Sequence, residues 1–165
     1  MSNEELIMQT LRSASITEEL RDAELAALAQ AITVREYKAG TYLIQPGNSV
    51  EKDSLLILAS GEAEVTASMN GETATMKLTE PGDLAGIITF VGGNLAQISA
   101  TVQVKQDSKV LLLERARFES LLNSQPAVVY YVMRGIVRYV HGLVRRMNAQ
   151  SQEMSNYLYH MHGRY

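Results

Sequence analysis

The sequence predicts a mainly β protein with flanking helices, in which an antiparallel barrel is followed by one long C-terminal helix. The prediction rests on three changes of period along the chain. Apolar residues recur every three or four positions over residues 1–32, every second position over 33–114, and again at helical spacing over 115–165. We therefore expect N-terminal helices, a β-barrel, and a C-terminal part with a short and a long helix, in these three ranges.

Residues 1–31 have the apolar spacing of amphipathic helices. The residues that carry this spacing are Leu6, Ile7, Leu11, Leu20, Leu25, Leu28 and Ala29. Ser15 and Glu18 match a capping box, in which each side chain bonds a free backbone N–H of the first helical turn. A second helix is therefore expected to start at Ser15.

The middle of the chain alternates apolar and polar residues, as half-buried strands do, most clearly over 62–68, 73–78 and 98–105. Turn sequences separate these runs at Ala39-Gly40, Gln45-Pro46-Gly47-Asn48, Ser60-Gly61, Asn70-Gly71, Pro81-Gly82-Asp83 and Gly92-Gly93-Asn94. Asn70-Gly71 is a strong hairpin signal, because a type I′ turn needs positive φ at both central residues. About eight short strands spaced in this way predict an antiparallel barrel or sandwich.

A short helix is expected around residues 118–122, and after Pro126 the helical pattern continues for about 36 residues, or about 54 Å. Two series with a spacing of seven interleave along it: Met133, Val140, Met147, Met154 and Met161, and Val129, Ile136, Leu143, Gln150 and Tyr157. Alternating steps of three and four are the seam of a coiled coil. We expect a homodimer through the seam Val129, Met133, Ile136, Val140, Leu143, Met147, Gln150 and Met154, with Arg134, Arg138 and Arg145 on a solvated face.

Composition excludes several classes of function. The net charge of −3 gives no general attraction to nucleic acid or to an anionic membrane. With no cysteine, and with histidine only at 141, 160 and 162, the barrel lacks the histidine or cysteine ligands that a catalytic metal site of a barrel enzyme needs. No local motif suggests a catalytic group, so we expect no enzyme activity. The N-terminus lacks a signal-peptide pattern and no segment has the roughly 18 apolar residues of a membrane span, so we expect a cytoplasmic protein without membrane contact.

Several short segments together resemble the cyclic-nucleotide-binding domain, as in the catabolite activator protein family. They are Thr17-Glu18-Glu19-Leu20, Val34 to Gly40, Ile44-Gln45-Pro46-Gly47, Leu55 to Val65, Pro81-Gly82-Asp83-Leu84 and Ala100-Thr101-Val102. The resemblance covers roughly residues 17–155 and follows the order and spacing of the family's glycines. It implies a jelly-roll, or double-stranded β-helix, barrel with a long dimerisation helix.

The resemblance also implies a ligand site in the segment 84–101. In binding members a Gly-Glu pair opens a short helix that faces the phosphate, the glutamate takes the ribose hydroxyl, and an arginine some ten residues later neutralises the phosphate. Here Gly86 is followed by Ile87, and the arginine position is Ile98, or Gln97 after a one-residue slip. The candidate pocket residues are Leu84, Ala85, Gly86, Ile87, Ile88, Gln97, Ile98, Ser99, Gln150 and Ser151.

Two interpretations of these replacements stay open. In the first, apolar core side chains have filled a lost phosphate site, which the packing gain of isoleucine favours. In the second, the pocket has been reshaped for an uncharged or apolar ligand. A cyclic nucleotide is a doubtful ligand and no other cofactor is implied. The main rival is a small-molecule or nucleotide sensor that uses backbone amides near Gly86 and Ile88, with Ser99 and Ser151 assisting.

The long helix keeps part of the family's adenine contact. Where relatives that bind cyclic AMP have Thr-Ser, this sequence has Gln150-Ser151, and Gln150 at a seam position favours a role in fixing register. Transcription factors of the family continue into a helix-turn-helix, whereas this sequence ends at Tyr165, so we expect no direct DNA binding. The resemblance thus implies a dimeric regulatory or interaction module whose output depends on the dimer helix, and an unknown protein partner is one possibility.

Overall fold

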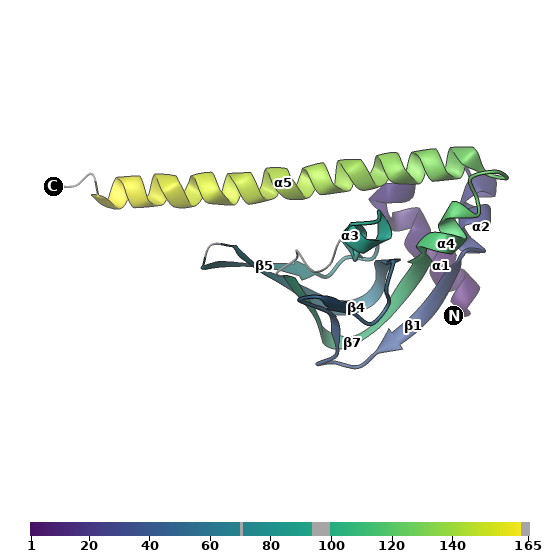
Figure 1. Cartoon of the computed structure of the whole chain (residues 1–165), viewed down its shortest axis with the longest axis horizontal. Helices are drawn as coiled ribbons and strands as arrows, with labels where there is room; N and C mark the ends of the chain where they lie inside the picture. Colours follow the sequence, from purple (N-terminus) through teal and green to yellow (C-terminus); the bar gives the residue numbers. More distant parts are fainter. Residues whose placement is uncertain (70, 94–99, 163–165) are drawn as a thin grey trace.

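A computed structural model describes residues 1–69, 71–93 and 100–162 of the chain. The elements are α1 (Asn3–Ser13), the 3-10 turn η1 (Ser15–Thr17), α2 (Asp22–Ala29), β1 (Ile32–Tyr37), β2 (Tyr42–Gln45), β3 (Asn48–Ser49), β4 (Ser54–Met69), β5 (Glu72–Leu78), β6 (Leu84–Ala85), α3 (Ile87–Phe90), β7 (Ala100–Glu114), α4 (Arg115–Glu119) and α5 (Pro126–His162). Figure 1 shows a curled sheet with the shorter helices gathered at one end and α5 extended above it. This is the mainly β architecture with flanking helices that the changes of period predict.

The strands form one antiparallel sheet around two long strands, β4 and β7. The order is β3-β2-β7-β4-β5, with β1 added on β7 and β6 on β4. The β4–β7 ladder runs from the pair Ser54 and Glu114 to the pair Ala67 and Ala100. At the other edge, Met69 pairs with Glu72, so two residues connect β4 to β5 and the predicted two-residue hairpin at Asn70-Gly71 is confirmed.

The prediction of about eight short strands is wrong in one respect, because Ser60-Gly61 is not a turn. β4 continues through it for 16 residues, and the pairing with β7 shifts register between Leu58 and Ala63. Gly61 has φ 95°, and a Cβ there would lie 2.7 Å from the carbonyl oxygen of Asp107. Glycine therefore lets β4 bend against β7, and the bend curls the sheet.

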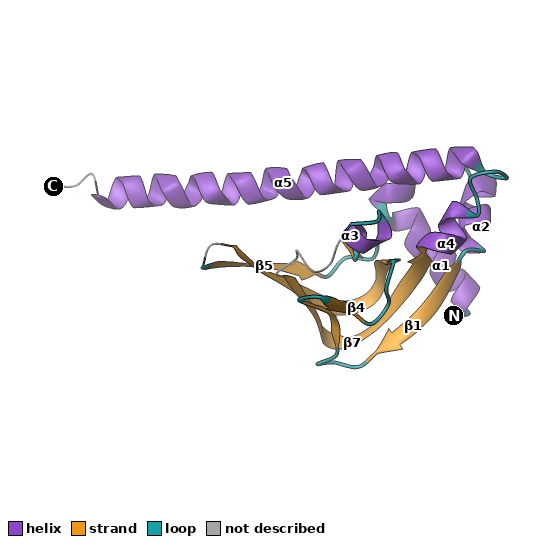
Figure 2. Cartoon of the chain, viewed as in Figure 1, coloured by secondary structure: helices purple, strands orange, loops and turns teal. Residues whose placement is uncertain are grey.

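Two apolar clusters lie on opposite faces of the sheet. Along β4, Leu55 and Ile57 contribute to the cluster under the helices, while Leu56 and Leu58 point into the curl. Both faces of this stretch are buried, which explains its unbroken apolar sequence. Figure 2 shows α1, α2 and α4 at one end of the sheet, with α3 and α5 above the rest of it.

The second helix starts later than Ser15 and Glu18 predict. Ser15–Thr17 is a single 3-10 turn, in which the Thr17 hydroxyl donates to the carbonyl of Ala14 and to that of Leu11. These bonds terminate α1 rather than begin a new helix. α2 begins at Asp22, and its capping box uses the Glu24 carboxylate, which accepts from the Arg21 N–H at 2.9 Å.

The first half of α5 packs against the helical end of the chain. Val128, Val132 and Ile136 are buried, and Gly135 lies against the backbone of Ile16 in η1. Among the helices of the described ranges, none has both the length and the apolar character needed to cross a membrane. Arg134 and Arg138 of the predicted arginine face are exposed, as predicted, and both are also connected to the segment that follows η1.

That connection consists of ion pairs. Arg134 Nε lies 3.2 Å from Glu19 Oε1, and Arg138 Nη2 lies 3.0 Å from Glu18 Oε1. Arg138 also bonds Glu19. These two arginines therefore help to fix the orientation of α5, whereas Arg145, two turns further on, is exposed.

The predicted dimer seam is divided between two environments. Ile136 is only 2% exposed and belongs to the chain's own core, and Val129 and Met133 pack against the same cluster. Val140 and Met147 are exposed, as is Gln150. The side chain of Met154 lies outside the description. Ile136 is thus a core residue rather than a seam residue, because α5 turns it toward η1 and α1.

Candidate ligand pocket

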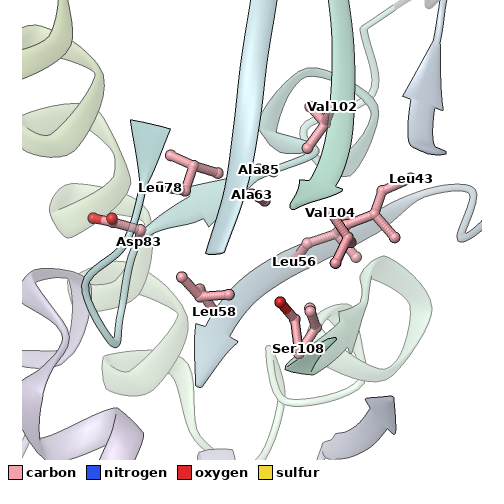
Figure 3. A pocket seen from close by; sticks show the side chains of 11 residues that line it. Leu43, Leu56, Leu58, Ala63, Leu78, Asp83, Ala85, Val102, Val104 and Ser108 are labelled. Atoms are coloured by element: carbon pink, nitrogen blue, oxygen red, sulfur yellow. The ribbon is translucent and has the colours of Figure 1, made fainter. Parts of the chain in front are cut away.

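The inside of the curl contains a cavity of only about 10 Å³, which we call the interior cavity. Figure 3 shows it enclosed by side chains from β2, β4 and β7, among them Leu43, Leu56 and Val104. Asp83 and Ser108 are the polar members of this wall. The space suffices for about one water molecule, so this part of the barrel is packed core.

A larger cavity of about 160 Å³, the outer pocket, lies where β6 and α3 meet β7 and α5. It is lined by Ile44, Val65, Met76, Leu84, Ala85, Gly86, Ile87, Ile88, Thr89, Ala100, Val102 and Leu143. The predicted run from Leu84 to Ile88 is thus part of one concave surface. The predicted residues Gln97, Ile98 and Ser99 lie outside the described residues.

The two predicted pocket residues on the long helix do not line this site within one chain; the resemblance implies that they reach the pocket of a partner chain across a dimer. Gln150 and Ser151 are exposed on α5 and are not among the residues that line the outer pocket. Leu143, which the heptad pattern places in the seam, lines the pocket instead. The heptad spacing identifies a buried helix face but not what that face contacts.

Glycine at position 86 lets the chain turn sharply from β6 into α3. Ala85 pairs with Leu56 of β4, and Gly86 then takes φ 76° as the N-cap of the helix. A Cβ at this position would lie 2.7 Å from the carbonyl oxygen of Ser54. Both the positive φ and the close approach require glycine, so the turn that forms one wall of the pocket is fixed by this residue.

The far end of α3 is held by its own contacts. The Phe90 ring packs on the ring of Phe118 from α4, with centroids 5.3 Å apart. The Arg115 guanidinium donates to the Thr89 carbonyl at 3.2 Å and pairs with Asp53 at 3.4 Å. α3 is therefore anchored at its C-terminal end as well as at Gly86, and Arg115 is not among the lining residues.

α5 contributes one wall through two residues a single turn apart. Leu143 lines the pocket, and the Tyr139 hydroxyl accepts the N–H of Leu84 at 3.1 Å. Burial raises the pKa of Tyr139, so the hydroxyl stays protonated at neutral pH. Sequence reasoning did not identify Tyr139, although its spacing of four from Leu143 puts the two side chains on one helix face.

The described residues that line the outer pocket include no charged side chain. The Thr89 hydroxyl donates to the Gly86 carbonyl at 3.4 Å and is the one side-chain polar group among them. In the sequence, no lysine or arginine occurs between Lys77 and Lys105. Nor do the described residues gather three His, Cys, Asp or Glu side chains at any point where a metal ion would fit.

Residues 34–125 match the sequence profile of the family described as "Cyclic nucleotide-binding domain". The chain belongs to the cyclic nucleotide-binding domain family. This family consists of regulatory domains that are typically non-enzymatic. The matched range contains β2 to β7, most of β1 and the turn at Gly86, and ends just before α5 begins.

Solved structures show the same fold. A cyclic nucleotide-binding domain from Methylobacillus flagellatus KT superposes with a TM-score of 0.75 at 18% identity, over 89% of this chain and 81% of that one. The catabolite activator protein of Thermus thermophilus gives a TM-score of 0.67 at 19% identity, over 86% and 63%. The antiparallel β-roll with a C-terminal helix, predicted from the sequence, is thereby confirmed.

Curated relatives are larger proteins. The chain is 31% identical over 112 residues to a cAMP-dependent protein kinase regulatory subunit of Emericella nidulans, covering 68% of this chain and 26% of that protein. It is 22% identical over 145 residues to human cGMP-dependent protein kinase 2, covering 87% and 18%. The chain therefore spans about a quarter or less of the length of these relatives.

The hairpin turn between β4 and β5 determines which residues of these strands lie opposite each other in the outer pocket. A two-residue turn at 70 and 71 pairs Val65 with Met76 across the hairpin, and both line the outer pocket. Val65 also pairs with Val102 of β7, which completes a strip of three apolar side chains. The hairpin signal in the sequence predicts the register of these strands. It does not predict the curl of the sheet that brings this strip opposite α3.

Proposed function

We propose that this chain is a non-enzymatic regulatory domain whose outer pocket does not hold a cyclic nucleotide in the family's usual way. The observation that supports this is the uncharged lining of the pocket. The resemblance places Ile87 where binding members have glutamate, and Ile98 or Gln97 where they have arginine. Both groups that would contact the ribose and the phosphate are replaced by uncharged side chains.

The physical argument concerns the phosphate. A singly charged phosphate that leaves water for an apolar pocket loses several kcal/mol of hydration, which a countercharge and good hydrogen bonds must offset. Among the described residues, the pocket offers the Thr89 hydroxyl and backbone groups but no cation. The bound state of an anionic nucleotide is therefore expected to be unfavourable.

Isothermal titration with cyclic AMP and cyclic GMP tests this proposal. We expect no saturable binding below about 1 mM of either nucleotide. A dissociation constant in the micromolar range would show that the phosphate finds a countercharge, and the proposal would fail. In that case Arg146→Ala is the decisive variant.

Arg146 supports the second candidate function, a nucleotide sensor. It lies on α5, near enough to the Tyr139 hydroxyl to oppose the rise in the pKa of Tyr139 that burial causes. Tyr139 in turn contacts Leu84 at the pocket wall. If Arg146→Ala abolishes a measured affinity for cyclic AMP, the cation comes from α5 rather than from the segment after α3.

We further infer that the chain forms a homodimer through α5, by a seam shifted from the predicted one. The α5 stripe, as we call it, consists of Tyr130, Met133, Val137, Val140, Val144 and Met147, at alternating steps of three and four. Val137 is 65% exposed and Val144 47% exposed, while the adjacent series at 129, 136 and 143 faces the chain's own domain. The stripe fits a second copy because it continues the heptad spacing of a coiled coil.

Light scattering of the purified chain tests the dimer. We expect twice the monomer mass of 18.2 kDa at micromolar concentration. Val137→Glu places a charge in the stripe and is expected to weaken dimerisation at least tenfold, about 1.4 kcal/mol. Ala149→Glu, on the exposed opposite side of the helix, is the matched control and leaves the mass unchanged. A monomeric wild type, or a dimer that Val137→Glu does not affect, contradicts the proposal.

A further inference from the structure

The outer pocket remains open although the phosphate-binding side chains have been replaced. Its volume is about 160 Å³, whereas the interior cavity of the same sheet is closed to about 10 Å³. Protein interiors leave few voids larger than a water molecule. Ile87 stands at the glutamate position and lines the outer pocket, yet the pocket has not closed in the way its neighbour has.

We propose that the outer pocket binds a small uncharged molecule whose surface is mainly hydrocarbon. The inference rests on the proposed function, since it takes the pocket to have lost its affinity for phosphate. Apart from Gly86 and Thr89, every described residue that lines it carries an aliphatic or thioether side chain. Binding of an apolar molecule to such a surface is favourable because both apolar surfaces are removed from water. A charged group would find no countercharge there.

The volume indicates the size of the ligand. An apolar cavity of about 150 Å³ in another protein stays dry and accepts benzene. The outer pocket therefore suits a molecule of one or two fused rings, or a branched chain of similar volume. A cyclic nucleotide is larger and carries a charge, so both size and chemistry separate the two ligand classes.

One polar feature gives the site a preference among apolar ligands. The Thr89 hydroxyl uses its hydrogen toward the Gly86 carbonyl, which leaves its oxygen free to accept. A ligand with a single N–H or O–H donor can use this acceptor. The Thr89 carbonyl already accepts from Arg115, so it competes less well for the same donor.

Access to the pocket does not need unfolding of the barrel. Ile88 lies on its rim and is 47% exposed, and Leu143 of α5 forms the facing wall. The hydrogen bond from Leu84 to Tyr139 holds that wall in place. A ligand that enters past Ile88 therefore contacts the sheet and α5 together.

Indole is the probe for the test, because the chain contains no tryptophan whose fluorescence would interfere. We expect the emission of indole to shift to shorter wavelength on titration with the chain, with a dissociation constant of about 0.1–1 mM. Neutral 3-ethylindole should bind at least as tightly. Indole-3-acetate, similar in size but anionic, should bind at least tenfold more weakly.

Two variants narrow the pocket from different elements. Ala100→Leu fills it from β7 and Leu143→Phe from α5, and each should weaken indole binding at least tenfold. Thr75→Leu, at an exposed position of β5 on the face away from Met76, is the matched control and should bind like the wild type. Because the two variants act from the sheet and from the helix, misfolding of one still leaves the other as a test.

The inference is overturned if indole shows no saturable binding, if indole-3-acetate binds as tightly as 3-ethylindole, or if neither filling variant weakens indole. Cyclic AMP is titrated in parallel. Micromolar binding of cyclic AMP refutes the proposed function, whereas absence of binding by both indole and cyclic AMP refutes only this inference.

Discussion

Replacement of Gly135 by alanine tests how α5 is fixed to the rest of the domain. A Cβ at this position would lie 2.6 Å from the carbonyl oxygen and 2.7 Å from the Cα of Ile16. Both are backbone atoms of a turn that is closed by the Thr17 hydroxyl, so they do not move as a side-chain end would. Overpacking of this kind costs about 1–3 kcal/mol.

Alanine in place of a helical glycine also brings a gain of about 0.8–1.0 kcal/mol from helix propensity. Gly142 separates the two effects, because a Cβ there meets no atom within 4 Å. We expect Gly142→Ala to stabilise the chain by about 1 kcal/mol, and Gly135→Ala to leave it about 1–3 kcal/mol less stable than Gly142→Ala. The difference isolates the contact with Ile16.

Urea unfolding followed by far-ultraviolet circular dichroism measures both variants. With a slope of about 1–3 kcal/mol per molar urea, the midpoints should differ by about 0.3–3 M. Equal midpoints would show that α5 does not pack closely on η1, and would contradict the contact between Gly135 and the backbone of Ile16. The same proteins checked by light scattering exclude a change of oligomeric state as the cause.

Two further substitutions test single contacts. Tyr139→Phe removes the acceptor of the buried Leu84 N–H and should lower the free energy of unfolding by about 1–2 kcal/mol in urea; an unchanged midpoint contradicts the contact between α5 and the pocket wall. The Ala39 N–H, and then Lys38, lower the pKa of Asp107 below its ordinary 3.8. Because the pKa is lower in the folded state, the ionised carboxylate stabilises the fold above pH 3.8, and this stabilisation is lost as the pH falls through the folded-state pKa. The wild type should therefore lose more stability than Asp107→Asn between pH 5 and pH 3.

Local patterns were sufficient for most of the fold. The alternation over residues 62–68 and 73–78 and the turn at Asn70-Gly71 specify a hairpin with its register, because side chains alternate between the faces of a strand. Helical spacing after Pro126 gave the length of α5 to within a residue or two. These features depend on neighbours in sequence, which is why they are legible without a structure.

Features that depend on distant contacts were misread. Gly61 has the sequence signature of a turn, yet its conformation serves the close approach of Asp107, which lies 46 residues further along the chain. The heptad series of Ile136 and Leu143 predicted a partner helix, whereas those side chains contact the chain's own core and pocket. Periodicity reports that a face is buried, and the same apolar residues serve a neighbour within the chain or outside it.

The ion pairs of Arg134 and Arg138 hold the first half of α5, so a small rotation of the helix there displaces its far end much more. From Arg138, the second of these paired residues, the helix extends for about 36 Å to His162. A rotation of about 5° at Arg138 displaces the last turn by about 3 Å, given this length. Leu143, which lines the pocket, lies about 7.5 Å beyond Arg138 along the helix, so a displacement there is multiplied about fivefold at the last turn of α5.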